Sequence, residues 1–104
     1  MLIELDIFSG RPNPRFRLSA RDGRTLVALH EALRAAKPEP PSLPGLGYRG
    51  FVYSIGGPMR AFRGHITGPS VALSDPTMTV ERFLLDRLPP EHAALRPAIL
   101  AALR

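Results

Sequence analysis

The sequence predicts a single α+β domain over residues 1–104, in which a small, mainly antiparallel sheet of about four or five strands is covered on one face by about three helices. Apolar and polar residues alternate in several short segments, which is the period of a half-buried strand. In other segments apolar residues recur at helical spacing, and glycine and proline separate the segments. With 104 residues and 44% hydrophobic content, the chain can form one core and is too short for two domains.

The first two strands are expected to form a hairpin. Apolar and acidic side chains alternate over residues 2–7, and arginine alternates with apolar residues over 15–18, after a turn rich in glycine and proline. Pro14 has no N–H to donate, which places the start of the second strand at an edge or a bulge. Ion pairs are expected across this hairpin between the acids of one strand and the arginines of the other: Glu4 and Asp6 with Arg15 and Arg17.

A helix is predicted over residues 20–36. Ser19 followed by Asp22 resembles a capping box, and leucine and alanine recur on one face of the segment. Residues 37–44 are rich in proline, so the chain must leave the helix there and continue in an extended conformation. We interpret this segment as a crossover within the domain, because neither side of it is long enough for a domain of its own.

The second half of the chain predicts more strands and then helices. A third strand is expected over 51–55 and a fourth over 59–67, joined by a turn at Gly56-Gly57-Pro58, and a short strand follows at 70–73. The next helix is expected to begin at Pro76, with Ser74 or Asp75 as its cap. The last helix is predicted over 91–103 and is kinked or divided at Pro97.

The net positive charge lies in the first three quarters of the chain, because basic and acidic residues balance over 75–104. The formal net charge is +5, and Lys37 is the only lysine among the 14 basic residues. Genomic base composition alone can produce this preference for arginine. However, no acidic residue occurs between Glu39 and Asp75, so this middle segment is the best candidate for a surface that binds an anion, an acidic peptide or nucleic acid.

Three breaks rich in glycine and proline each lead into an arginine, at residues 9–15, 44–49 and 56–60. Such turns fix the direction of backbone N–H groups and of guanidinium groups, which suits polar recognition. His65 is expected on the same strand face as Arg63, within the acid-free segment. The predicted binding residues are therefore the arginines of these breaks and their neighbours: Arg11, Tyr48, Arg49, Arg60, Arg63 and His65.

No motif predicts catalysis, a metal site or a cofactor. Residues 45–50 spell G-x-G-x-x-G, but a proline-rich run precedes them and a strand follows, whereas a dinucleotide site needs a strand before and a helix after. His30, His65 and His92 are far apart in the sequence and do not have the spacing of metal ligands. No serine has a histidine and an acid placed by the sequence to activate it. Asn13, between two prolines, is expected to form a structural Asx turn.

The sequence predicts a cytoplasmic protein. It contains no cysteine, so disulfides and thiolate metal sites are excluded, and a reducing compartment is expected. The alternating N-terminus differs from a signal peptide, and no segment has the length of a membrane span.

The chain resembles a group of small bacterial proteins without an established function, through the strings Phe8-Ser9-Gly10-Arg11-Pro12-Asn13-Pro14 and Gly47-Tyr48-Arg49-Gly50-Phe51. The resemblance covers most of the length. It implies that these two loops belong to the type, and it implies no catalytic residue.

These observations favour a non-enzymatic accessory or binding protein. We expect it to recognise a peptide or protein partner through its arginine-rich loops and an exposed sheet edge, in the manner of small proteins that deliver a peptide to a separate modifying enzyme. The alternative is binding of single-stranded nucleic acid or another anion, with aromatic residues of the middle segment stacking on bases. A small enzyme acting on an anionic substrate is a third possibility, in which His65 would work beside nearby arginines.

Overall fold

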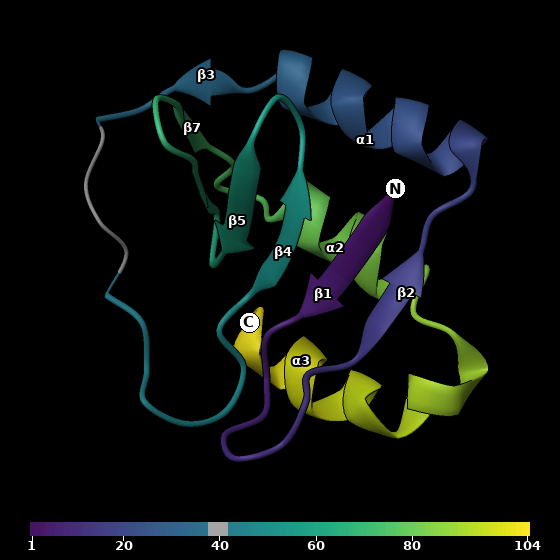
Figure 1. The fold of residues 1–104 in the computed structure, drawn as a ribbon. Coiled ribbons are helices and arrows are strands. Elements are labelled where there is room, and N and C mark those ends of the chain that lie inside the picture. The colour runs from purple at the N-terminus through teal and green to yellow at the C-terminus, as the bar shows by residue number, and fades with distance from the viewer. Residues whose placement is uncertain (38–41) are drawn as a thin grey trace.

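The computed structural model describes residues 1–37 and 42–104, and Figure 1 shows their fold. It is an α+β structure whose described part contains a seven-stranded antiparallel sheet and three α-helices. The strands are β1 (Leu2–Leu5), β2 (Arg15–Arg17), β3 (Arg34–Ala35), β4 (Phe51–Ser54), β5 (Pro58–Phe62), β6 (His65–Thr67) and β7 (Ala72–Ser74). The helices are α1 (Ala20–Glu31), α2 (Thr79–Leu85), the 3-10 helix η1 (Pro90–Leu95) and α3 (Arg96–Ala102).

The predicted fold class is confirmed, but the sheet is larger than expected. Two findings account for the difference. The segment 59–67, predicted as one strand, turns back at Arg63 and Gly64 and forms parts of β5 and β6. The helix predicted over 20–36 ends at Glu31, and Arg34 and Ala35 then pair with β7 as an edge strand.

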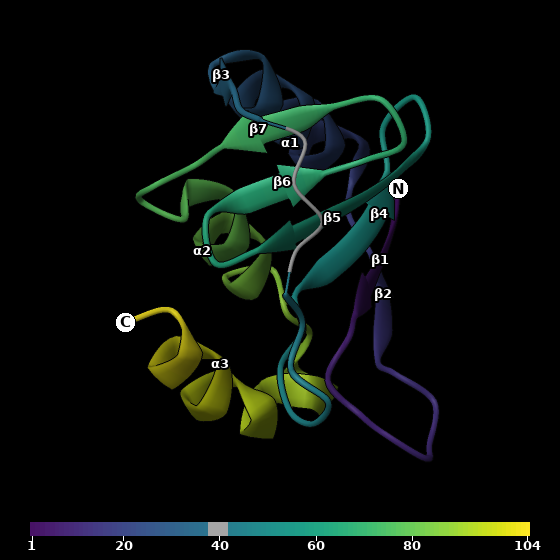
Figure 2. The ribbon, with the colours of Figure 1, turned by 90° about the vertical axis from the view of Figure 1, so that its left-hand side faces the viewer.

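The order of the strands is β2-β1-β4-β5-β6-β7-β3, so β2 and β3 form the two edges. Helix α1 connects these edges, because it follows β2 and precedes β3 in the sequence. Its start matches the prediction, since the Ser19 hydroxyl accepts a hydrogen bond from the Asp22 N–H at 3.0 Å. In Figure 2, α2 and α3 lie together on one side of the sheet.

Strand alternation divides the sheet into an inner and an outer face. The inner face contributes side chains that are 5% exposed or less: Ile3, Phe16, Phe51, Tyr53, Met59, Ala61 and Ile66. The helices supply Leu26, Val80, Leu84, Leu85 and Ile99 to the same core. The outer face carries Glu4, Val52, Arg60 and Thr67, which lie opposite one another in the register of β1, β4, β5 and β6.

Gly50 brings two segments into close contact just before β4. Its φ is +102°, and a Cβ atom there would lie 2.3 Å from the Ala61 carbonyl oxygen. Only glycine permits this approach. Gly50 therefore allows the crowded start of β4.

The turn between β5 and β6 contains only Arg63 and Gly64, whose φ angles are +47° and +81°. Positive φ at both central residues is the geometry of a type I′ hairpin turn. Gly64 adopts it without strain, whereas Arg63 carries a Cβ atom and does not. The local sequence indicates this turn only weakly, because the common residues at its first position are asparagine, aspartate and glycine.

The last third of the chain departs from prediction in its boundaries. Helix α2 begins at Thr79 instead of Pro76, because Asp75 starts a turn in which the Met78 N–H donates to the Asp75 carbonyl at 2.8 Å. The Asp75 carboxylate still caps the helix by accepting from the Val80 N–H at 2.9 Å. The predicted last helix is divided into η1 and α3, immediately before Pro97.

Candidate functional site

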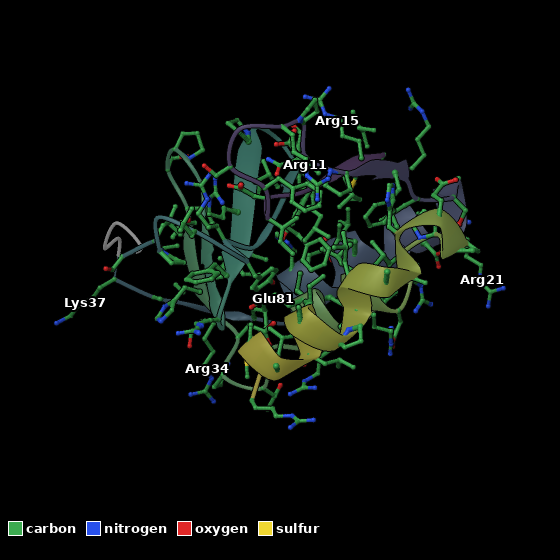
Figure 3. All side chains as sticks on the ribbon, turned by 90° about the horizontal axis from the view of Figure 1, so that it is seen from below. Arg11, Arg15, Arg21, Arg34, Lys37 and Glu81 are labelled. Carbon is green, nitrogen blue, oxygen red and sulfur yellow. The ribbon has the colours of Figure 1, made fainter. Side chains whose placement is uncertain are left out.

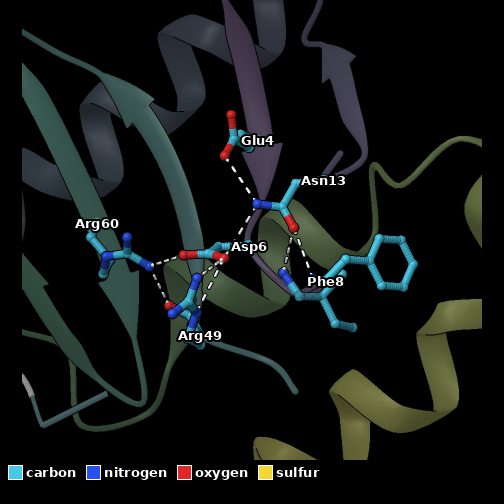
Figure 4. Close-up of polar contacts among 7 residues, drawn as sticks. Glu4, Asp6, Phe8, Asn13, Arg49 and Arg60 are labelled. Atoms are coloured by element: carbon cyan, nitrogen blue, oxygen red, sulfur yellow. Dashed lines mark hydrogen bonds and ion pairs between the residues drawn. The ribbon is translucent and has the colours of Figure 1, made fainter. Parts of the chain in front are cut away.

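Asp6 lies directly after β1 and joins three segments that are distant in the sequence (Figure 4). Its carboxylate accepts hydrogen bonds from the Arg49 guanidinium at 3.0 and 3.3 Å and from Arg60 at 2.8 Å. The Asp6 residue is only 4% exposed. Arg60 also donates to the Arg49 carbonyl at 2.7 Å, which closes the cluster.

Asn13 connects this cluster to the loop between β1 and β2. Its side-chain oxygen accepts from the Ile7 and Phe8 N–H groups at 3.0 and 2.8 Å. Its amide nitrogen donates to Glu4 at 3.2 Å and to Asp6 at 3.3 Å. The side chain therefore satisfies the loop backbone and orients two carboxylates, which is a structural role as predicted. The predicted Asx turn is wrong, because the Asn13 oxygen bonds the N–H groups of Ile7 and Phe8, earlier in the chain.

The electrostatics of Asp6 show what the two arginines do. Burial raises the pKa of the Asp6 carboxyl, but the hydrogen bonds and positive charges of Arg60 and Arg49 outweigh this effect, and the pKa lies below its ordinary value. The expected partner of Asp6 across the hairpin was an arginine of β2. Only Glu4 forms such a pair, with Arg15 at 3.1 Å. Arg49 and Arg60, two of the predicted binding residues, thus form ion pairs with Asp6 within the protein.

Tyr48, a third predicted binding residue, is also internal. Its hydroxyl donates to the carboxylate of Glu81 on α2, and Glu81 accepts a second hydrogen bond from the Gly64 N–H at 2.9 Å. Burial and the nearby Glu81 charge raise the pKa of Tyr48 above its ordinary value. Glu81, itself 1% exposed, thereby fixes the β5–β6 turn to α2.

Arg63 and His65 are the two predicted residues that meet in one open cavity. We call it the basic cavity; its volume is about 510 Å³. Among the described residues, its lining contains a lysine, an arginine and a histidine and no acidic side chain: Ala36, Lys37, Ser42, Phe62, Arg63, His65, Ile66, Thr67, Ala72 and Leu73. Arg63 and His65 are both exposed residues of the β5–β6 hairpin.

Arg11 lies at a second cavity, on a different part of the molecule. This loop cavity, of about 480 Å³, is formed between the β1–β2 loop and η1. It is lined by Phe8, Arg11, Pro12, Asn13, Pro14, Arg15, Glu91, His92, Ala94 and Leu95. The Arg11 guanidinium carbon stands 3.7 Å from the centre of the Phe8 ring. Figure 3 shows Arg11 close to Arg15, with Lys37 on the far side of the molecule.

The loop cavity adjoins the open edge of β2. Two backbone bonds flank the β1–β2 ladder, from the Leu5 N–H to the Pro14 carbonyl at 2.9 Å and from the Leu18 N–H to the Met1 carbonyl at 2.8 Å. In an antiparallel pair, every second residue directs its backbone groups toward the partner strand. Phe16 therefore faces β1, whereas Arg15 and Arg17 direct their N–H and C=O groups away from it, toward the open edge.

Sequence reasoning missed several residues of these sites. It assigned no role in binding to Phe8, Arg17, Lys37 or Leu95, because their proximity arises only from tertiary packing. Pro14 did indicate the edge position of β2. Asp6 also carried a signal, since aspartate is uncommon in a strand and an acid beside an acid-free basic segment favours ion pairing.

In residues 1–37 and 42–104, no group of three or more His, Asp or Glu side chains is arranged to hold a metal ion. None of the helices in these ranges is both long and apolar enough to cross a membrane. Comparisons with protein-family models, with curated proteins and with solved structures found no match to the chain.

Proposed function

We propose that this protein is a non-enzymatic binding module that adds an extended segment of a peptide or protein partner to the edge of β2. The observation that carries the proposal is the position of the loop cavity beside that edge, with Pro14 and Arg15 belonging to both. Backbone groups of an added strand supply affinity, and a neighbouring pocket for one side chain supplies specificity.

The chemistry of the two surfaces defines the partner. Phe8, Pro12 and Leu95 give the loop cavity apolar walls, which suit one apolar side chain of the partner. Arg11 and Arg15 line the cavity, and Arg17 lies two residues further along β2. All three are exposed, and guanidinium groups favour carboxylates. The partner is therefore an extended acidic segment with an apolar anchor. Such a module suits an accessory role beside a separate enzyme that modifies the bound peptide.

Binding of single-stranded nucleic acid is the weaker proposal. It needs exposed aromatic rings on which bases stack. Four aromatic side chains of the middle segment are instead 8% exposed or less: Tyr48, Phe51, Tyr53 and Phe62. The segment still has positive charge to attract phosphates, but the guanidinium groups of Arg49 and Arg60 are paired with the Asp6 carboxylate.

Fluorescence anisotropy tests the peptide proposal. The probe is a labelled decapeptide in which valine and glutamate alternate around one central leucine. We expect saturable binding that is lost when lysine replaces glutamate, and lost when alternate backbone nitrogens are methylated, because methylation removes the N–H groups that pair with β2. Binding that tolerates both changes contradicts strand addition.

Two substitutions at Arg17 separate the backbone from the side chain. Arg17→Pro removes an N–H that points to the open edge while leaving the β1–β2 ladder intact. Arg17→Ala removes the charge and keeps the N–H. We expect Arg17→Pro to weaken the peptide more than Arg17→Ala, with far-UV circular dichroism confirming that both variants are folded. Equal effects would show that the edge backbone does not bind the peptide.

A further inference from the structure

The basic cavity carries a separate inference, independent of the peptide edge. Its volume of about 510 Å³ lies within the range of small-molecule sites. Lys37, Arg63 and His65 line it, and Ser42 and Thr67 add hydroxyl groups. Among the described residues, no acidic side chain lines the cavity.

Arg63 is placed there at a cost to the backbone. Its φ of +47° is a conformation that asparagine or glycine adopts readily and that other residues avoid. Within the described chain Arg63 forms no ion pair, and its guanidinium carbon lies 5.6 Å from the centre of the Phe62 ring. Backbone strain that brings no ion pair within the described chain points to a role for the side chain in binding.

The turn that presents Arg63 is held rigidly. The buried Glu81 carboxylate accepts from the Gly64 N–H at 2.9 Å, and a Cβ atom at Gly64 would lie 2.7 Å from the Asp75 carbonyl oxygen. His65 then pairs with Ser74 in the sheet, and Thr67 pairs with Ala72. The guanidinium, imidazole and hydroxyl donors therefore stand on a preorganised hairpin, which reduces the entropy lost when a ligand binds.

We propose that the basic cavity binds the phosphate group of a small organic phosphomonoester of about nucleotide size. A phosphate needs positive charge, which Arg63 and Lys37 supply, and several hydrogen-bond donors, to which His65 and the hydroxyl groups of Ser42 and Thr67 add. The cavity is larger than a bare phosphate requires, and the partly exposed Ala72 and Leu73 in its wall offer apolar contacts for the organic part of the ligand.

Titration of the isotope-labelled protein, followed by NMR, tests this proposal with three probes: adenosine 5′-monophosphate, adenosine and inorganic phosphate. We expect the monophosphate to shift the amide signals of Arg63, Gly64, His65 and Thr67 and to bind more tightly than either other probe. If adenosine binds as tightly as the monophosphate, the cavity does not recognise the phosphate, and the proposal is wrong. If inorganic phosphate binds as tightly, the organic part of the ligand does not contribute to binding.

Arg63→Asn provides the decisive variant. It removes the positive charge, so we expect affinity for the monophosphate to fall at least about tenfold. It also relieves the backbone strain of the turn, because asparagine adopts a positive φ more readily than arginine. The melting temperature is expected to stay the same or to rise by a few degrees, about 4 °C. Arg21→Gln, on the exposed surface of α1, serves as a control that leaves binding unchanged. Unchanged affinity in Arg63→Asn would overturn the proposal, and so would an equal loss of affinity in Arg21→Gln.

Discussion

The Arg60 guanidinium meets the Asp6 carboxylate at 2.8 Å on the outer face of the sheet, although the two residues are separated by 54 positions in the sequence. Backbone bonds reinforce this contact. The Asp6 N–H donates to the Gly50 carbonyl at 2.9 Å, and the Arg49 N–H donates to the Asp6 carbonyl at 2.7 Å. Asp6 thereby fixes Arg49 and Gly50, which precede β4, against β1 and β5.

Asp6→Asn should lower the free energy of unfolding by about 2 kcal/mol, because it leaves Arg49 and Arg60 adjacent without their shared anion. Urea denaturation followed by circular dichroism measures the change. Glu4→Gln provides a matched control, since its pair with Arg15 is more exposed and contributes less than about 1 kcal/mol. An equal loss in the two variants would contradict the role assigned to the Asp6 cluster.

His30 should make the stability depend on pH. Burial lowers the pKa of His30, and its ring Nε2 lies 2.6 Å from the Tyr53 hydroxyl. The unfolded chain therefore takes up a proton near pH 6.5, its ordinary value, before the folded protein does. Stability present above about pH 6.5 is expected to be lost as the pH falls through the lower pKa of the folded state.

Melting curves of the protein and of His30→Gln between about pH 8 and pH 5 test this expectation. Glutamine can still bond Tyr53 but does not titrate in this range. We expect the pH dependence to be weaker in the variant. An identical pH dependence in both proteins would show that other groups cause it.

The sequence predicted the elements whose own residues determine them. The alternation of apolar and polar residues predicted β1, β2 and β4, and Ser19 as a cap predicted the start of α1. The extent of α1 was wrong because helical spacing continues through Arg34 and Ala35, whose pairing with β7 is a tertiary contact. The same holds for the turn at Arg63, where buried Glu81 and the sheet register prevail over the weak local signal.

The candidate sites were predicted less completely, for a related reason. An arginine at a loop has the same local sequence whether it binds a partner or an internal acid. Arg49 and Arg60 meet Asp6 only when the sheet has formed. Arg63 and His65 both line the basic cavity, but the prediction that they share one strand face was wrong, because Arg63 lies in the turn between β5 and β6. Arg11 reaches the loop cavity because η1 packs beside its loop, and no local pattern indicates that contact.

The hydroxyl of Tyr48 should contribute more to stability than the hydroxyl of Tyr53. Tyr48→Phe removes one of the two hydrogen bonds to the Glu81 carboxylate, a charged group that is 1% exposed, so we expect a loss of about 2 kcal/mol in the free energy of unfolding. Tyr53→Phe is the matched control. It removes a bond to the neutral His30 ring, for which about 1 kcal/mol is expected. Urea denaturation at pH 8 compares the two variants, because His30 is then uncharged.

Amide hydrogen exchange at Gly64 should accelerate in Tyr48→Phe, since a Glu81 carboxylate that has lost one hydrogen-bond donor holds the turn less firmly. Equal losses in the two variants, with unchanged exchange at Gly64, would mean that Glu81 does not depend on Tyr48 to fix this turn.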